Sequence, residues 1–295
     1  LYIITGLFVG LQKTKTSSIA VGFFSLLNIL ISIVLVTIFD LNIKGVAYGT
    51  FFSALITSSI FLFYTFFYLS KFTKIKIDFG QVLNLNKIKD IFDINLDIFI
   101  RTILVTFSFL WFTYLGTQIG EDYVAANAIL INLVFLSAFI LDAYAFSTEG
   151  IVGYSLGKKD LNLFKNIVKN SFILSSLSGL IISIIYFFSY EYVINLISDL
   201  EEIRKLSSSY VIWLIILPLI SSFCYQFDGI FIGASQTKEL RNAMVFSVLS
   251  YLIISIVLTR LLFNDGIWIS LCIFMILRAL SLFYYLNKIY LRFKS

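Results

Sequence analysis

The chain contains no histidine, one proline and two cysteines among its 295 residues. Without histidine it cannot build a His-based catalytic triad, a histidine metal site or a histidine proton relay. Cys224 and Cys272 lie inside apolar runs and lack the spacing of a metal or disulfide motif, so we interpret them as small buried residues. Charged residues make up only 13% of the chain. A soluble globular protein has about 25%, so this composition cannot cover a water-exposed surface.

Hydrophobic residues dominate instead, at 59% of the chain, and they form long runs. A helix needs about 20 mostly apolar residues to span a bilayer. Eight runs meet this criterion, and residues 1–10 resemble the tail of one more helix. The runs are residues 17–39, 46–69, 91–117, 123–147, 166–190, 207–233, 242–263 and 267–288. The sequence therefore predicts an all-α, polytopic protein of the lipid bilayer.

Lysine and arginine divide unevenly between the two sides of the predicted spans. With the loop of Lys13 and Lys15 placed inside, 16 of the 22 basic residues fall on that side. The others are Lys44, Arg204, Lys205 and Arg260 outside, and Arg101 and Arg278 within spans. Because cytoplasmic loops are enriched in Lys and Arg, we predict a multi-pass protein of the inner or plasma membrane with a cytoplasmic C-terminus. The same topology accounts for the net charge of +5 without a nucleic-acid partner.

The chain also repeats itself. Residues 6–16 (GLFVGLQKTKT) resemble residues 229–239 (GIFIGASQTKE) at an offset of 223, and at that offset residues 31–35 and 254–258 both read ISIVL. After a two-residue gap, Gly45 matches Gly266. Both copies place their basic loop inside, which predicts a parallel repeat of the kind found in some secondary transporters.

The repeat also predicts how the chain is divided. Residues 1–69 form part of a first lobe, residues 70–90 a basic linker, and residues 91–295 a second lobe of six helices. The linker interleaves basic and apolar residues, as in cytoplasmic segments that lie at the membrane interface. The offset puts the start of the first copy about 130 residues before the chain begins. We therefore expect an N-terminally truncated part of a chain of about 425 residues, with six helices in each lobe.

Ionisable side chains inside predicted spans are costly in hydrocarbon and mark candidate functional sites. They are Asp97, Arg101, Asp142, Glu149, Asp228 and Arg278. The four-residue spacing of Asp97 and Arg101 predicts an ion pair, either purely structural or broken by substrate or a proton. Asp142 could pair with Arg278 or Arg101, or carry a proton itself. Glu149, two turns further along the same helix, could face the same way or reach interfacial water.

Proline and the aromatic residues add two further candidates. Pro218 frees a backbone carbonyl and permits a bend, so it is either a hinge or a static kink. The aromatic cluster could line a cavity for organic cations, or it could face lipid. It includes Phe107, Phe109, Trp111 and Phe112 among other aromatic residues.

Four stretches, in this order and spacing, carry a resemblance to a known family. They are residues 95–102 (NLDIFIRT), 124–127 (VAAN), 149–153 (EGIVG) ending in Gly157, and 226–233 (QFDGIFIG) followed by 239–242 (ELRN). The chain resembles the multidrug and toxic compound extrusion (MATE) family, in its DinF-like branch, from the fourth to the twelfth helix of that fold. The resemblance implies two six-helix lobes that rock to export organic, amphipathic and often cationic compounds. It implies H⁺ or Na⁺ as the coupling cation and no other cofactor.

The family's functional positions carry over one by one. Asp228, beside Gln226, matches an acid that takes part in cation coupling or drug binding in some branches, and Asn127 belongs to the VAAN stretch. Asn28 resembles the Asn of the fifth helix. Many members have an acid four residues later, where this chain has Ser32, so a coupling site contributed by that helix is weakened. The first-helix acid usually credited with coupling is absent from the sequence given, so H⁺ and Na⁺ are not distinguished.

Three functions remain in competition. The first is export of a small molecule by a monomeric cation antiporter. The second is a flippase for lipids or lipid-linked sugars, which would need a cavity rich in arginine, whereas acids outnumber Arg101 and Arg278 in these spans. The third is a membrane-embedded enzyme, which the absence of histidine and of a clustered Asp motif disfavours.

Overall fold

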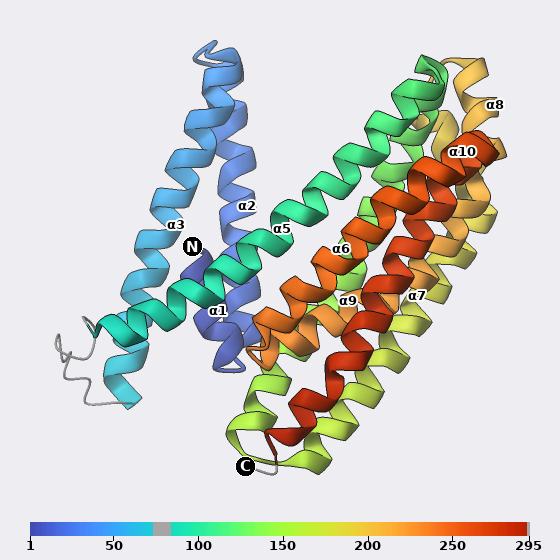
Figure 1. Cartoon of the computed structure of the whole chain (residues 1–295). Helices are drawn as coiled ribbons and strands as arrows, with labels where there is room; N and C mark the ends of the chain where they lie inside the picture. Colours follow the sequence, from blue (N-terminus) through green and yellow to red (C-terminus); the bar gives the residue numbers. More distant parts are fainter. Residues whose placement is uncertain (73–83, 294–295) are drawn as a thin grey trace. The chain divides into compact units, whose positions relative to one another are not determined.

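The structure is a computed structural model that describes residues 1–72 and 84–293. Residues 73–83, the centre of the predicted basic linker, lie outside the described part, as do the predicted inside positions Lys74 and Lys76. The described residues form α-helices joined by short turns, and no strand occurs among them (Figure 1). The all-α prediction is therefore confirmed. The chain divides into two compact units, Leu1–Ile88 and Lys89–Ser295, which are described separately below.

Among its described residues, unit 1 contains three whole helices and the first residues of α5 (Leu85–Ile119). The whole helices are α1 (Tyr2–Gly10), α2 (Thr14–Thr37) and α3 (Asn42–Phe72). The α2 and α3 helices pack along one another, and Gly49 lies so close to α2 that a Cβ added there would fall 2.9 Å from the Ser32 Cα. Phe8 of α1 is buried, with its ring centroid 5.8 Å from Tyr64 and 5.9 Å from Tyr68. Small residues and one aromatic cluster thus hold this unit together.

Unit 2 is built mainly from α6, α7, α9 and α10, with α9 packed against the other three. The helices of this part of the chain are α5 (Leu85–Ile119), α6 (Glu121–Gly157), α7 (Leu161–Ile197), α8 (Glu201–Ser209), α9 (Val211–Gly233) and α10 (Thr237–Leu291). The large core includes Trp268, Tyr251 and Phe112, which are almost fully buried. The α5 helix reaches this core through Phe112, whose ring lies 4.9 Å from that of Trp268.

The 55-residue α10 folds back on itself at Phe263, where φ is +51°. Its two arms lie side by side (Figure 1). Two contacts join them: the ring centroids of Tyr251 and Phe274 are 5.2 Å apart, and Lys288 Nζ lies 2.9 Å from Glu239 Oε1. Gly266 permits this reversal, since an added Cβ would lie 2.7 Å from the backbone nitrogen of Thr259. The two predicted runs 242–263 and 267–288 are therefore the two arms of one helical hairpin.

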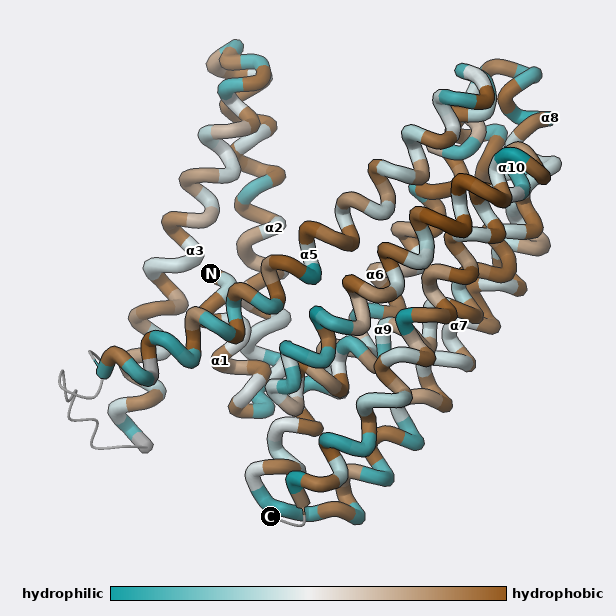
Figure 2. The backbone as a smooth tube through the Cα atoms, viewed as in Figure 1, coloured by the Kyte–Doolittle hydropathy of each residue, from teal (hydrophilic) through white to brown (hydrophobic). Residues whose placement is uncertain are grey.

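Seven described helices are long and apolar enough to span a membrane, and the hairpin in α10 makes eight crossings in the described part of the chain. Hydrophobic residues cover most of each long helix, and hydrophilic residues gather toward the helix ends (Figure 2). The predicted run 207–233 needs correction at its start. Residues 207–209 belong to α8, a separate short helix with two acids in its first turn, and the spanning helix begins at Val211.

The predicted repeat is present in the local backbone. Gln12, between α1 and α2, has φ +57°, and Ser235, 223 residues later between α9 and α10, has φ +53°. The same offset relates Asp40 (φ +56°) to Phe263 (φ +51°), so each unit turns back at the corresponding residue. The turn after α6 has the same design, with Lys159 at φ +54°. A helical hairpin whose turn contains a residue with positive φ therefore recurs in this chain.

Candidate functional site

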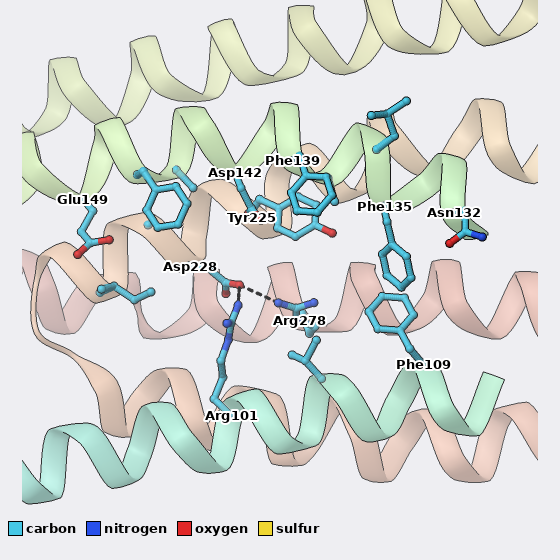
Figure 3. A pocket seen from close by; sticks show the side chains of 17 residues that line it. Arg101, Phe109, Asn132, Phe135, Phe139, Asp142, Glu149, Tyr225, Asp228 and Arg278 are labelled. Atoms are coloured by element: carbon cyan, nitrogen blue, oxygen red, sulfur yellow. Dashed lines mark hydrogen bonds and ion pairs between the residues drawn. The ribbon is translucent and has the colours of Figure 1, made fainter. Parts of the chain in front are cut away.

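A cavity of about 610 Å³ lies within unit 2, between α5, α6, α9 and the second arm of α10. Five ionisable side chains line it together with an aromatic wall (Figure 3). The ionisable residues are Arg101, Asp142, Glu149, Asp228 and Arg278. The structure thus brings together five of the six ionisable candidates predicted from the spans.

Close packing of α6 on α9 positions the acids. A Cβ added to Gly229 would lie 2.9 Å from the carbonyl carbon of Ala145, and one added to Gly233 would lie 2.9 Å from the Cα of Glu149. Small residues spaced by four let helix backbones approach closely in membranes. Because Asp228 directly precedes Gly229, this seam places its carboxylate beside the face of α6 that carries Glu149.

Two arginines share one carboxylate at the centre of the cavity. Arg101 from α5 and Arg278 from α10 both donate to Oδ2 of Asp228, with an Nη2–Oδ2 distance of 2.7 Å for Arg278 (Figure 3). The Arg278 and Asp228 side chains are 2% and 6% exposed, whereas Arg101 is 21% exposed. Charge-assisted hydrogen bonds of this kind are among the stronger ones in proteins. Arg278 also lies over the ring of Phe274, at 5.4 Å.

This cluster leaves polar capacity unused. The Oδ1 atom of Asp228 and the Nε atoms of Arg101 and Arg278 are buried without a hydrogen-bond partner among the described residues. Leaving such groups unpaired in a low-dielectric interior is costly. The cluster is therefore able to accept a further polar or charged group.

Asp142 and Glu149 line the cavity on α6, two helical turns apart. Both side chains are half-buried. Of the two alternatives for Glu149, facing the same way as Asp142 or reaching interfacial water, the structure shows the first, because both residues line the cavity. Of the two alternatives for Asp142, pairing with Arg101 or Arg278 is not the one observed, because both arginines bind Asp228. That Asp142 carries a proton stays a prediction. Three carboxylates and two guanidinium groups give the cavity an excess of one negative charge when all are ionised.

The predicted Asp97–Arg101 ion pair is also wrong. The carboxylate of Asp97 accepts from Arg241 Nη1 at 2.5 Å and from the Thr237 hydroxyl at 3.0 Å. These partners lie in the first turns of α10, and Asp97 is 3% exposed. Asp97 therefore anchors α5 to the start of α10, and it does not line the cavity.

Two amide side chains from the predicted set are structural in this conformation. Gln226 Oε1 accepts from the Thr148 hydroxyl at 3.0 Å and so joins α9 to α6, while its Nε2 has no partner among the described residues. Asn127 and Asn264 exchange hydrogen bonds of 2.6 and 3.1 Å, and Trp268 donates to Asn127 at 2.9 Å. Neither Gln226 nor Asn127 lines the cavity.

Pro218 lies inside α9, which continues through it, and α7 braces this position. The Ser183 hydroxyl donates to the carbonyl of Ile215, three residues before the proline, at 2.6 Å. A Cβ added to Gly179 would lie 2.8 Å from the carbonyl oxygen of Pro218. Pro218 has no N–H to donate to the carbonyl of Leu214, four residues earlier in the helix. The Ser183 contact adds a donor at the neighbouring carbonyl, and a hinge role for Pro218 stays a prediction.

Asn28 belongs to unit 1, where its Nδ2 donates to the Thr50 hydroxyl at 2.9 Å and joins α2 to α3. Ser32, at the position where many family members have an acid, has a buried hydroxyl without a partner among the described residues. A coupling role for Asn28 stays a prediction.

The aromatic wall differs from the predicted one. Of the four predicted aromatics only Phe109 lines the cavity, where its ring packs on Phe135 at 4.8 Å. Trp111 instead donates to Ser255 at 2.9 Å. Sequence reasoning did not name the other residues of the wall. On α6 they could have been found from helical spacing, because they precede and follow Asp142 at intervals of three or four residues. The missed residues are Asn132, Phe135, Phe139, Phe146 and Tyr225.

The chain is similar to two curated proteins over most of its length. It is 29% identical over 283 residues to DNA damage-inducible protein F of Escherichia coli (strain K12), covering 95% of this chain and 61% of that protein. It is 24% identical over 277 residues to Protein DETOXIFICATION 43 of Arabidopsis thaliana, covering 94% and 51% respectively. This chain therefore spans between half and two thirds of these curated relatives.

Solved structures show the same fold. A multidrug resistance MATE family transporter in an outward-facing conformation matches with a TM-score of 0.87 at 16% identity, covering 99% of this chain and 66% of that chain. The Vibrio cholerae MATE transporter VcmN in the bent form matches with a TM-score of 0.81 at 17% identity, covering 94% and 62% respectively. The MatE family model matches residues 98–261, which is more than half of the chain. This polytopic membrane protein belongs to the MatE family, and its relatives include the DinF protein predicted from its motifs.

Proposed function

We propose that this chain forms part of a cation-coupled antiporter that exports organic, amphipathic or cationic compounds by alternating access of two lobes. One observation carries the proposal: a cavity inside membrane-spanning helices holds three carboxylates, two arginines and an aromatic wall. Both arginines are bound to Asp228, so Asp142 and Glu149 are the acids available to a positive charge. Phenyl rings such as Phe109 and Phe135 can add cation–π contacts.

The charge balance suggests how coupling would work. The cavity has one more carboxylate than it has guanidinium groups, so one added positive charge neutralises it. Either a coupling cation (H⁺ or Na⁺) or a cationic substrate can supply that charge, and binding of one then weakens binding of the other. Negative coupling between two ligands is reciprocal, which is what exchange transport requires. We place the protein in the inner or plasma membrane as a monomer with a cytoplasmic C-terminus.

The test is transport by the protein expressed from its complete gene and reconstituted into vesicles. Ethidium serves as the organic cation, and a proton or sodium gradient is imposed in turn. We expect gradient-dependent extrusion that stops when the gradient is dissipated. Absence of extrusion, together with indifference to both gradients, would refute the proposal. Transfer of a fluorescent lipid between leaflets under the same conditions would instead support a flippase.

Asp142→Asn tests the proposed coupling acid. Removing a charge that contacts the transported cation should lower transport at least tenfold, because a hydrogen bond to a charged group contributes about 1.5–3 kcal/mol. Asp122→Asn is the matched control, since Asp122 is an exposed acid on the same helix and lies outside the cavity. Unaltered transport in Asp142→Asn would remove this residue from the mechanism.

A further inference from the structure

A second hollow lies on unit 2, between α7, α9 and the second arm of α10. It has a volume of about 630 Å³, and every residue that lines it is apolar. A neighbouring hollow of about 560 Å³ extends along α7 past Ser176 and shares Phe172, Leu219 and Phe223 with the first. Together they form one continuous groove, here called the apolar groove.

The aromatic residues of the apolar groove form a packed row. Phe172 lies 4.8 Å from Phe227 and 6.0 Å from Phe223, and Phe227 lies 6.3 Å from Phe283, measured between ring centroids. Phe223 and Phe283 are 47% and 62% exposed, so the groove is open to its surroundings. A groove that is long, apolar and open along its length suits a flexible hydrocarbon chain.

One end of the apolar groove is basic. Lys169 and Lys165 precede Phe172 by three and seven residues on α7, which puts them on the same helical face toward the start of the helix. The start of α7 adjoins the end of α10, since the rings of Phe164 and Tyr290 are 5.4 Å apart. The two lysines therefore lie at the end of the groove where both of these helices meet their flanking turns.

These lysines have no observed ion-pair or cation–π partner among the described residues, unlike Lys288 and Lys158. Lys165 and Lys169 are exposed, and neither forms an ion pair or a cation–π contact with a described residue. By contrast, Lys288 binds Glu239 at 2.9 Å, and Lys158 lies 4.3 Å over the ring of Tyr154. The basic end of the groove is thus free to bind an anion.

We propose that the apolar groove binds an anionic glycerophospholipid from the surrounding bilayer. One acyl chain lies over Phe172 and Phe223, and the phosphate contacts Lys165 and Lys169. Apolar packing alone gives little preference in a membrane, because lipid tails are as apolar as the groove. The headgroup charge therefore decides which lipid binds. The positive-inside topology predicts this end on the cytoplasmic side, where anionic lipids give the leaflet its negative potential.

The inference does not depend on the transport proposal, and lipid binding can be measured directly. The complete protein in detergent micelles is titrated with dioleoyl phosphatidylglycerol or dioleoyl phosphatidylcholine, and bound lipid is counted by native mass spectrometry. Each lysine near an anionic headgroup should contribute about fivefold in affinity. We therefore expect phosphatidylglycerol to bind more than tenfold more tightly than phosphatidylcholine.

Matched variants separate the headgroup from the chain. Lys165→Ala with Lys169→Ala should abolish the preference for phosphatidylglycerol. Lys158→Ala with Lys238→Ala should keep it, because those exposed lysines lie at the same end of unit 2 but outside the groove. Ser176→Phe, or Leu180→Phe if the first variant does not fold, should weaken binding of both lipids by filling the groove.

Three results would overturn the inference. The first is a preference that survives loss of Lys165 and Lys169, or that falls equally in the control pair. The second is unchanged phosphatidylglycerol binding in folded Ser176→Phe or Leu180→Phe, which would mean that no chain occupies the groove. The third is displacement of the lipid by glycerol 3-phosphate at equal concentration, which would identify a site for free phosphates.

Discussion

Replacing Asp228 with Asn tests whether the Arg101–Asp228–Arg278 cluster holds unit 2 together. The substitution keeps the side-chain shape and one acceptor oxygen but removes the one carboxylate that binds these arginines among the described residues. Arg278 is 2% exposed and has no alternative acid among its hydrogen-bond partners in the described structure. Its charge would therefore remain buried and unpaired.

The expected loss follows from burial. Removing one partner of a buried ion pair costs about 3–5 kcal/mol, because the remaining charge cannot be hydrated. Arg101→Met should cost only about 1 kcal/mol, since Arg101 is 21% exposed and its loss leaves the Asp228–Arg278 pair intact. At about 2–4 °C per kcal/mol for domains of this size, Asp228→Asn should lower the unfolding temperature by about 6–20 °C.

The chain contains its own reporter of unfolding. Cys224 and Cys272 are its two cysteines, and both are buried as free thiols. A thiol-reactive fluorophore therefore stays dark on the folded protein in detergent and reacts as unit 2 opens. Cys224 lies four residues before Asp228 on α9, so the readout monitors the helix that carries the perturbation.

A double variant decides between a buried charge pair and simple misfolding. Asp228→Asn combined with Arg278→Met removes both buried charges and leaves Arg101, which is partly exposed. We expect this protein to be more stable than Asp228→Asn alone, as found when an unpaired buried charge is relieved. A loss below about 1 kcal/mol in Asp228→Asn, or full additivity in the double variant, would refute the reasoning.

Two further predictions use the same thermal assay. Gly229→Ala should destabilise by about 1–3 kcal/mol through overpacking against Ala145, although alanine is the better helix former; Gly157→Ala, where an added Cβ meets nothing within 4 Å, is the control and should lose no stability. Asn127→Ala should cost about 1–3 kcal/mol, because it leaves the buried Asn264 amide without its partner. If Asn127→Ala leaves the unfolding temperature unchanged, the Asn127–Asn264 pair is dispensable for stability. If Gly229→Ala and Gly157→Ala lower the unfolding temperature equally, packing against Ala145 is not the cause.

The repeat could be predicted from the sequence because its signal is local. Matching Gly, Thr and Lys residues at an offset of 223 correspond to one kind of turn, in which Gln12 and Ser235 both adopt positive φ. The gap between two apolar runs predicts the fold-back at Phe263, and Asp40 at the corresponding position also has positive φ. Turn geometry and apolar run length are properties of a few consecutive residues, so one sequence is enough to find them.

The ion pairs could not be predicted in the same way. Sequence spacing offers Asp97 only the nearby Arg101, whereas folding brings Arg241, 144 residues away, within 2.5 Å of it. Arg101 is thereby free to bind Asp228, 127 residues away. Burial in a span identified which charges matter, but the choice among partners depends on how helices pack. That information resides in the Gly229 seam and in the start of α10 rather than in helical periodicity.

The packing seam and the cavity are parts of one structure. Gly229 and Gly233 set how closely α9 approaches α6, and Asp228 and Glu149 project into the cavity from the same turns. A substitution that separates the helices would therefore also move these carboxylates apart and weaken their joint attraction for one cation. In water-excluded surroundings such electrostatic interactions depend steeply on distance. Small residues at this seam consequently contribute both to stability and to the positions of the carboxylates. Transport by Gly229→Ala should therefore fall by more than the loss of folded protein explains.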